Sequence, residues 1–212
     1  MLPKPIKYLI FFISLSLVLY HSVYFKRLDE VQLTAQRDKF DPQKYAADFW
    51  YNRLLKNLDS ATDVNHLLEL FENDMPQAIQ RYARTLGIAS VHSYLVKGQG
   101  QVRVIEETGI QITTREPQTQ TDVRLKTSFI FGNAIRDASG LINVSDFPST
   151  MEFNNISVEI NRIVKNEIIP PLLKQIKVGQ NINFVAATEV REQNPEIHPL
   201  ELVPIQVEVL EK

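Results

Sequence analysis

The stretch VHSYLVKGQGQVRVIE, residues 91–106, decides the fold class of this chain. Two runs rich in β-branched and aromatic residues, Val91–Lys97 and Gln101–Glu106, flank Gly98-Gln99-Gly100. A glycine-containing break between such runs is typical of a hairpin, so we predict two strands joined by a turn at these glycines. A third run, Ile110–Thr114, follows one more glycine-containing break and extends the same sheet.

Further strands are predicted downstream of this stretch. Hydrophobic residues or threonine occupy every second position from Val123 to Phe131, the period of one long half-buried strand. Leu141–Val144 is a further short candidate. Two runs near the end of the chain, Ile182–Val190 and Val203–Leu210, predict the last two strands, and the second of these alternates cleanly.

One set of helical patterns precedes the first predicted strand, and another interrupts the series of predicted strands. Asp41-Pro42 suits a helix start, and apolar residues at helical spacing follow until Gly87, which we expect to cap the last of three helices. A second apolar stripe runs from Met151 to Ile168, and Pro170-Pro171 ends or kinks that helix. The fold class is therefore α+β. We expect a small helical unit and then either a curved antiparallel sheet or a small barrel of the OB-like kind, with one long inserted helix.

An apolar run stands near the beginning of the chain. Tyr8 to Phe25 are 18 uncharged residues between Lys4/Lys7 and Lys26/Arg27. As a helix this run would measure about 27 Å, close to the roughly 30 Å hydrocarbon core of a bilayer. We expect a single-pass anchor in the cytoplasmic membrane with the larger part of the chain in the periplasm; a cleaved signal peptide and a buried core helix are the alternatives.

These patterns divide the chain into three parts. Residues 1–27 form the expected membrane anchor, and residues 28–39 form a polar stalk. Residues 40–212 form a single extracytoplasmic domain, with its helical part at 40–87 and its mainly β part at 88–212. Trp50, in the helical part, is expected to be buried rather than to stack on a ligand, since aromatic residues at helical spacing usually belong to a core.

Composition excludes several classes of function. The chain has 23 basic and 25 acidic residues, and four of the basic ones flank the apolar run, so the remainder is mildly acidic and unsuited to nucleic acid. There is no cysteine, and the 4 histidines are scattered, so no spacing of metal ligands is present. We find no catalytic motif and no signature of a cofactor-binding loop.

One polar segment, residues 132–140, is the candidate ligand site. Gly132, Asn133, Arg136 and Asp137 follow the end of the predicted strand. Arg136 could hold a carboxylate or a pair of sugar hydroxyl groups with its planar guanidinium, and Asp137 could orient it. In the favoured alternative, Arg136 and Asp137 instead close the loop by hydrogen bonds to the backbone.

Three segments carry a resemblance to a known family: Val96–Val102, then Phe131–Ala138, and Glu159-Ile160-Asn161 together with Ile168–Pro171. They resemble the bacterial domain-of-unknown-function family 2291, which consists of predicted periplasmic proteins or lipoproteins. The resemblance implies an extracytoplasmic, membrane-attached protein, often encoded beside sugar ABC transporters, with no established enzymatic activity. This chain differs from the lipoprotein members because it has no cysteine near the apolar run.

The leading functional hypothesis is a non-enzymatic accessory or binding module associated with sugar uptake. Its expected partners are the membrane, through residues 8–25, and components of a sugar ABC transporter or a sugar-binding protein. The alternative is a structural or assembly protein of the cell envelope that binds another protein and no small ligand. A hydrolase that uses Asp137 or Asp146 with Arg136 would need converging carboxylates in a deep pocket.

Overall fold

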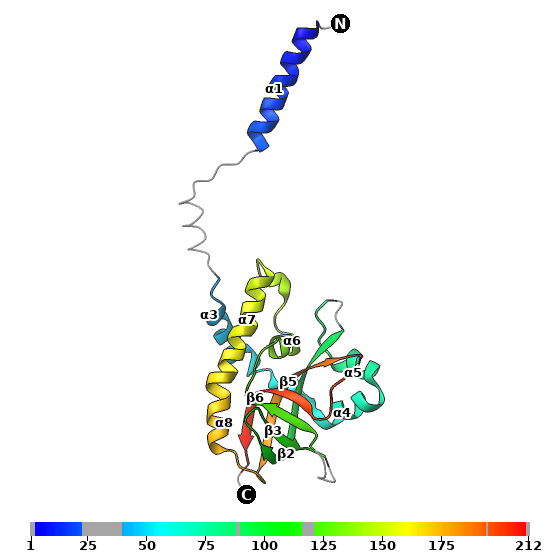
Figure 1. Ribbon diagram of the computed structural model, residues 1–212, viewed down its shortest axis with the longest axis vertical. Helices are drawn as coiled ribbons and strands as arrows, with labels where there is room; N and C mark the ends of the chain where they lie inside the picture. Colours follow the sequence, from blue (N-terminus) through cyan, green and yellow to red (C-terminus); the bar gives the residue numbers. More distant parts are fainter. Residues whose placement is uncertain (1–2, 23–39, 88–89, 116–120, 194, 211–212) are drawn as a thin grey trace. The chain divides into compact units, whose positions relative to one another are not determined.

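The computed structural model describes residues 3–22, 40–87, 90–115, 121–193 and 195–210 (Figure 1). The chain divides into two units, Met1–Phe40 and Asp41–Lys212. The first unit contains helix α1, Lys4–Ser22. Within the described ranges, no helix has both the length and the apolar character needed to cross a membrane, so the membrane span expected over residues 8–25 is not found. Residues 23–25 and the predicted stalk at 28–39 lie outside the described part.

The second unit begins with short helices, as predicted. The side chain of Asp41 accepts hydrogen bonds from the backbone N–H groups of Gln43 and Lys44, which confirms the predicted N-cap. Trp50 is only 1 % exposed, which confirms that it belongs to the core. The elements of this part are α3 (Pro42–Asp48), the π-helix η1 (Phe49–Leu54), the 3₁₀-helix η2 (Leu58–Ser60), β1 (Thr62–Asp63), α4 (Val64–Asn73) and α5 (Met75–Tyr82).

The predicted glycine cap at Gly87 is wrong. Helix α5 ends at Tyr82, and Ala83 is its C-cap with extended backbone angles. Gly87 does have a positive φ of 65°, but it lies in the connection that follows. The helix ends early because Arg84 exchanges backbone hydrogen bonds with Ser93, and this pairing needs an extended chain.

The strands form a mixed six-stranded sheet. Its order is β1-β2-β3-β4-β6-β5, and β2 also pairs with β5, so β2 has three neighbours and each strand from β3 to β6 has two. The pairings β1–β2 and β4–β6 are parallel, which corrects the expectation of a purely antiparallel sheet. The strand bounds are β2 (Val91–Ile105), β3 (Gly109–Thr113), β4 (Val123–Lys126), β5 (Asn181–Arg191) and β6 (Leu200–Val209).

The predicted turn at Gly98-Gln99-Gly100 is also wrong, because β2 runs through these residues as one strand of 15 residues. A Cβ atom at Gly98 would lie 2.7 Å from a methyl group of Val64 and 2.8 Å from the ring of Phe184. A Cβ atom at Gly100 would lie 2.5 Å from the carbonyl oxygen of Thr113. These glycines therefore serve close packing rather than chain reversal.

Strand β4 is shorter than predicted. It ends at Lys126, and Phe129 has a φ of 52°, which breaks the strand geometry. Phe129 and Phe131 are 72 % and 70 % exposed, whereas Ile130 between them is 1 % exposed. The alternation expected to bury the phenylalanines is thus reversed at the end of this segment.

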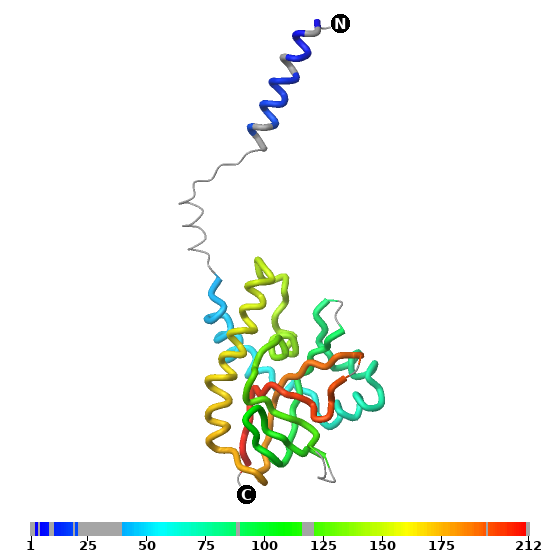
Figure 2. Tube along the Cα trace, in the orientation of Figure 1, coloured from blue at the N-terminus to red at the C-terminus, as the bar shows by residue number. Residues whose placement is uncertain are grey.

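A helical insertion joins β4 to β5. The strand expected over Leu141–Val144 is absent from the described chain, where a 3₁₀-helix occupies Val144–Asp146. Pro170 and Pro171 lie in the first turn of α8, so they continue the helical path instead of ending it (Figure 2). The elements are α6 (Ala134–Ser139), η3 (Val144–Asp146), α7 (Thr150–Ile163), the π-helix η4 (Val164–Ile168) and α8 (Ile169–Gln175).

The largest group of buried side chains lies between the strands and α4. Phe71 of α4 packs edge-on against Tyr94 of β2, with ring centroids 5.0 Å apart. Leu67 and Leu68 of the same helix are fully buried beside inward-facing strand residues such as Val102 and Ile112. Figure 1 shows α7 and α8 running along one side of the sheet.

Candidate functional site

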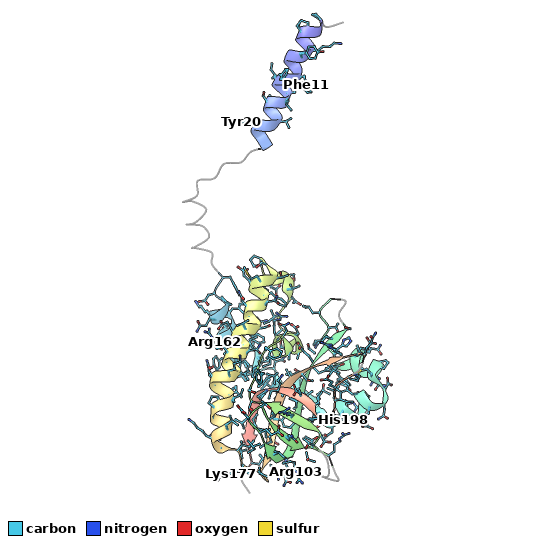
Figure 3. All side chains as sticks on the ribbon, in the orientation of Figure 1. Phe11, Tyr20, Arg103, Arg162, Lys177 and His198 are labelled. Carbon is cyan, nitrogen blue, oxygen red and sulfur yellow. The ribbon has the colours of Figure 1, made fainter. Side chains whose placement is uncertain are left out.

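A polar cleft lies where β4, the end of β5 and the start of β6 meet the connection between β5 and β6. Its volume is about 500 Å³. The charged and polar residues that line it are Arg124, Thr188, Glu189, Glu196, His198 and Glu201. We call this region the polar cleft; Figure 3 labels His198, which lies near α4.

Arg124 is held in place at one wall of the polar cleft. One of its terminal nitrogens lies 2.9 Å from a carboxylate oxygen of Glu106 and also donates to the hydroxyl of Thr108. The other lies 3.6 Å from a carboxylate oxygen of Glu201. A Cβ atom at Gly109 would lie 2.5 Å from Nε of Arg124, so only glycine leaves room for this side chain. The guanidinium is therefore fixed by a set of internal partners.

Lys126 connects the polar cleft with an exposed aromatic ring. Its Nζ lies 3.3 Å from a carboxylate oxygen of Glu201 and 5.0 Å from the centroid of the Phe131 ring. A cation over an aromatic face is attractive, so Lys126 helps to orient Phe131. The margin of the cleft thus offers an aromatic face beside charged groups.

Glu189 joins the polar cleft to the candidate loop predicted from the sequence. Its carboxylate accepts a hydrogen bond from the backbone N–H of Asn133, at 3.3 Å. Partial burial raises the pKa of Glu189, and the negative charge of Asp137 acts in the same direction. The hydrogen bond from Asn133 and the charges of Arg136 and Lys126 oppose this rise. The balance leaves a carboxyl group that holds its proton more tightly than usual.

The four candidate residues have different surroundings. Gly132 has a φ of 88°, and its carbonyl oxygen accepts a hydrogen bond from the side chain of Asn161 at 2.9 Å. The backbone N–H of Asn133 donates to Glu189, which lines the polar cleft. Gly132 and Asn133 thus form the part of the loop nearest to the cleft.

Arg136 is buried and bonded within the fold. Its exposed fraction is 2 %. Nε donates to Asp137 at 2.7 Å, and a terminal nitrogen donates to the carbonyl oxygen of Phe153 at 3.1 Å and to the side chain of Asn154 at 3.2 Å. These contacts match the alternative in which Arg136 and Asp137 close the loop, with helix α7 as the receiving element.

The sequence alone did not single out the residues of the polar cleft. Arg124 and Glu201 lie far apart in the chain and meet because β4 and β6 pair in parallel, with Arg124 opposite Glu201. His198 comes from the loop between the last two strands, and its Nε2 lies 3.6 Å from a carboxylate oxygen of Glu72 in α4. Because strand register brings these residues together, no local sequence motif predicts the cluster.

The carboxylates do not form a recognisable metal centre. Within the residues that the structure describes, no group of three or more His, Asp or Glu side chains is placed to hold a metal ion. The arrangement instead combines fixed charges, hydrogen-bond acceptors and an aromatic face, which is a composition suited to binding a polar organic molecule.

Comparison with known proteins identifies the fold and the family. A crystal structure of an OB-fold protein from Thermotoga maritima is similar over 82 % of this chain and 100 % of that chain, with a TM-score of 0.76 and 28 % sequence identity. No curated protein matches this chain. The family described as predicted periplasmic lipoprotein, domain-of-unknown-function family 2291, matches residues 13–208. Because the match spans most of its length, the chain belongs to this family of predicted periplasmic lipoproteins.

Proposed function

We propose that this chain is an extracytoplasmic, membrane-associated binding protein whose polar cleft takes up a polyhydroxylated small molecule of the sugar class. It acts by binding and has no catalytic role of its own in this proposal. The observation that carries the proposal is the cleft itself, with Glu189, Glu196 and Glu201 at its walls and Phe131 at its margin.

The position of the cleft supports a binding role. OB-folds bind oligosaccharides and oligonucleotides on the face of their second and third strands and in the loops after the first and fourth strands. Without the two-residue strand β1, the sheet has five strands, β2 to β6. Of these β4 is the third, and the loop between β5 and β6 follows the fourth. Arg124 and residues 195–199 bring both regions to the polar cleft.

The charges of the cleft favour hydroxyl groups over phosphates. Ionised carboxylates accept hydrogen bonds only, so they suit the O–H donors of a sugar. The cationic groups are already engaged, since Arg124 and Lys126 both contact Glu201. Binding to a nucleic acid would instead require a basic face.

For membrane attachment, we propose the N-terminal apolar segment. The chain has no cysteine for a thioether-linked lipid. In helix α1 the side chains of Phe11, Phe12 and Tyr20 are 60 %, 61 % and 81 % exposed, and Figure 3 labels Phe11 and Tyr20. Extraction of membranes at alkaline pH tests this point: the full chain is expected to stay with the lipid, and its release into the soluble fraction would contradict attachment.

Thermal unfolding of the full chain against glucose, xylose, ribose and inositol tests the ligand. A ligand at 100 times its dissociation constant adds about 2.7 kcal/mol to the free energy of unfolding, so one sugar is expected to raise Tm clearly. Glu201→Gln is expected to abolish that rise, because it removes the carboxylate shared by Arg124 and Lys126. Glu208→Gln, on the same strand but outside the cleft, is the matched control.

A second candidate function is assembly with another envelope protein. Phe129 and Phe131 expose large apolar rings close together in the chain, and such rings are common at protein interfaces. The proposed partner class is a component of a sugar transporter or a sugar-binding protein. A photocrosslinking residue at Phe129 in intact cells distinguishes the two candidates: one discrete crosslinked partner and no sugar response would favour assembly.

A further inference from the structure

Two neighbouring cavities lie on the side of the fold formed by η1, η4 and α8, and they share the side chains of Tyr51 and Glu167. The larger one, which we call the apolar cavity, has a volume of about 540 Å³. Its apolar walls include Trp50, Leu55, Ile168, Leu172, Val207 and Val209. This volume lies within the range of roughly 300 to 1,000 Å³ that small-molecule sites occupy.

The smaller cavity has a different character. Its volume is about 230 Å³, and we call it the hydrophilic cavity because Gln43, Asn166, Glu159 and Arg162 line it. Arg162, labelled in Figure 3, pairs with Glu159 one turn away, so these two charges compensate each other. An apolar cavity and a hydrophilic one thus adjoin at a common boundary, Tyr51 and Glu167.

Both boundary residues come from π-helical segments. Tyr51 lies in η1, Phe49–Leu54, and Glu167 lies in η4, Val164–Ile168. A π-helical turn inside an α-helix is rare and is found frequently at functional sites. Here two π-helical segments far apart in the sequence, η1 directly after α3 and η4 between α7 and α8, line the same pair of cavities. This is an observation independent of the cavity volumes.

A phenol and a carboxylate meet at the boundary between the two cavities. The hydroxyl of Tyr51 donates a hydrogen bond to the Glu167 carboxylate, and this hydrogen bond is the main reason that the pKa of Tyr51 is raised. Tyr51 therefore stays a neutral donor. Within the described part of the chain, no Lys, Arg or His forms an ion pair with Glu167. A carboxylate that accepts a hydrogen bond from one phenol has further acceptor positions for a ligand.

We propose that these two cavities form a second binding site, separate from the polar cleft, for a cationic amphiphile. The apolar body of the ligand lies against Leu55, Leu172 and Val207, and its ammonium head donates to Glu167 on the hydrophilic side. An amphiphile with a carboxylate head would face Glu167 with a like charge and is rejected.

The single tryptophan of the chain, Trp50, lines the apolar cavity and reports on this site directly. The experiment uses the full chain in a zwitterionic amphipol, which adds no tryptophan, and titrates it with ω-bromodecylamine or, at matched concentration, ω-bromodecanoate. Bromine quenches tryptophan on contact. The amine is expected to quench Trp50 saturably, with an apparent affinity about tenfold or more above that of the carboxylate, the size of one charge-assisted hydrogen bond.

Variants separate the head contact from the body contact. Glu167→Gln keeps an acceptor for Tyr51 and is expected to lower the affinity for the amine about tenfold, which removes the preference over the carboxylate. Val209→Phe narrows the apolar cavity and is expected to weaken both ligands. Glu208→Gln, its neighbour outside both cavities, should leave the titration unchanged. Circular dichroism of each variant confirms that it is folded.

Three outcomes would overturn the proposal. They are non-saturable quenching by both compounds, equal affinities for the amine and the carboxylate, and an unchanged amine titration in folded Glu167→Gln. The first would mean partition into the amphipol only. The second and third would mean that Glu167 does not select the head group.

Discussion

The guanidinium of Arg136 lies over the ring of Phe153, with its Cζ 3.6 Å from the ring centroid. The same side chain donates to the carbonyl oxygen of Phe153 and to Asp137. One residue thus joins α6, which carries Asp137, to α7, which carries Phe153. The arginine of the candidate ligand loop is therefore a structural link between two helices.

Replacement of Arg136 should therefore destabilise the fold. Arg136→Ala leaves the side chain of Asp137 and the carbonyl of Phe153 without their donor, and we expect a loss of about 3 kcal/mol in the free energy of unfolding. Arg136→Lys should recover part of this loss, because lysine restores the charge but not the planar fork. Urea denaturation measures both. Arg103→Ala, at an exposed strand position, is the control and should stay within about 0.5 kcal/mol of the parent. A parent-like Arg136→Ala would show that the link is dispensable.

Gly100 should tolerate no side chain. The added methyl group of Gly100→Ala would meet the carbonyl oxygen of Thr113 at 2.5 Å, so β2 and β3 would have to separate locally. We expect a cost of about 1 to 3 kcal/mol, typical of overpacking. Gln99→Ala, at the exposed neighbouring position, should be close to neutral. Equal midpoints of urea denaturation for the two variants would contradict the close contact.

Tyr94 should be replaceable by phenylalanine without loss. Its ring packs against Phe71, but its buried hydroxyl finds no hydrogen-bond partner among the described residues. Tyr94→Phe keeps the ring and removes the unpartnered group, so we expect unchanged or higher stability, by about 0 to 1 kcal/mol. Tyr82→Phe is the matched comparison, because the Tyr82 hydroxyl lies 3.2 Å from His66 and its loss should be unfavourable. A larger loss for Tyr94→Phe than for Tyr82→Phe would reverse this interpretation.

Glu189 should make stability depend on pH. Its folded pKa is raised above the ordinary value of 4.5, so the folded protein holds this proton more tightly than the unfolded chain does. The contribution of Glu189 to stability therefore falls as the pH rises from 4.5 through the raised folded pKa. Glu189→Gln removes the titration, and its stability relative to the parent should increase over that interval. Thermal unfolding from pH 4 to pH 7 measures the difference; a difference that shrinks with rising pH would contradict the sign.

Local features of the sequence predicted the elements whose cause is local. Asp41 caps the helix that follows because its carboxylate reaches backbone groups two and three residues away. The alternating residues of the last two strands correctly predicted β5 and β6. The α+β class and the burial of Trp50 followed from the same periodicities. The family resemblance rested on short motifs that are also readable along the chain.

Errors arose where distant residues decide the local conformation. Gly98 looks like a turn residue, yet Phe184 and Val64 fill the space beside it, and the strand continues. Phe129 and Phe131 continue an alternating pattern, yet the chain leaves the sheet after Lys126 and exposes both rings. In each case a glycine or aromatic residue has several allowed conformations, and long-range packing selects one of them.

The sequence by itself determined where α3 begins, that the last two strands are extended and that the chain is α+β, because these properties depend on neighbours within a few positions. The tertiary structure alone decided that Arg136 is buried and that Arg124 meets Glu201. It also brought Tyr51 from η1 to Glu167 from η4. These contacts depend on strand register and helix packing. The chemical identity of a residue sets what it can bind, but only the folded chain sets which groups lie within about 4 Å of it.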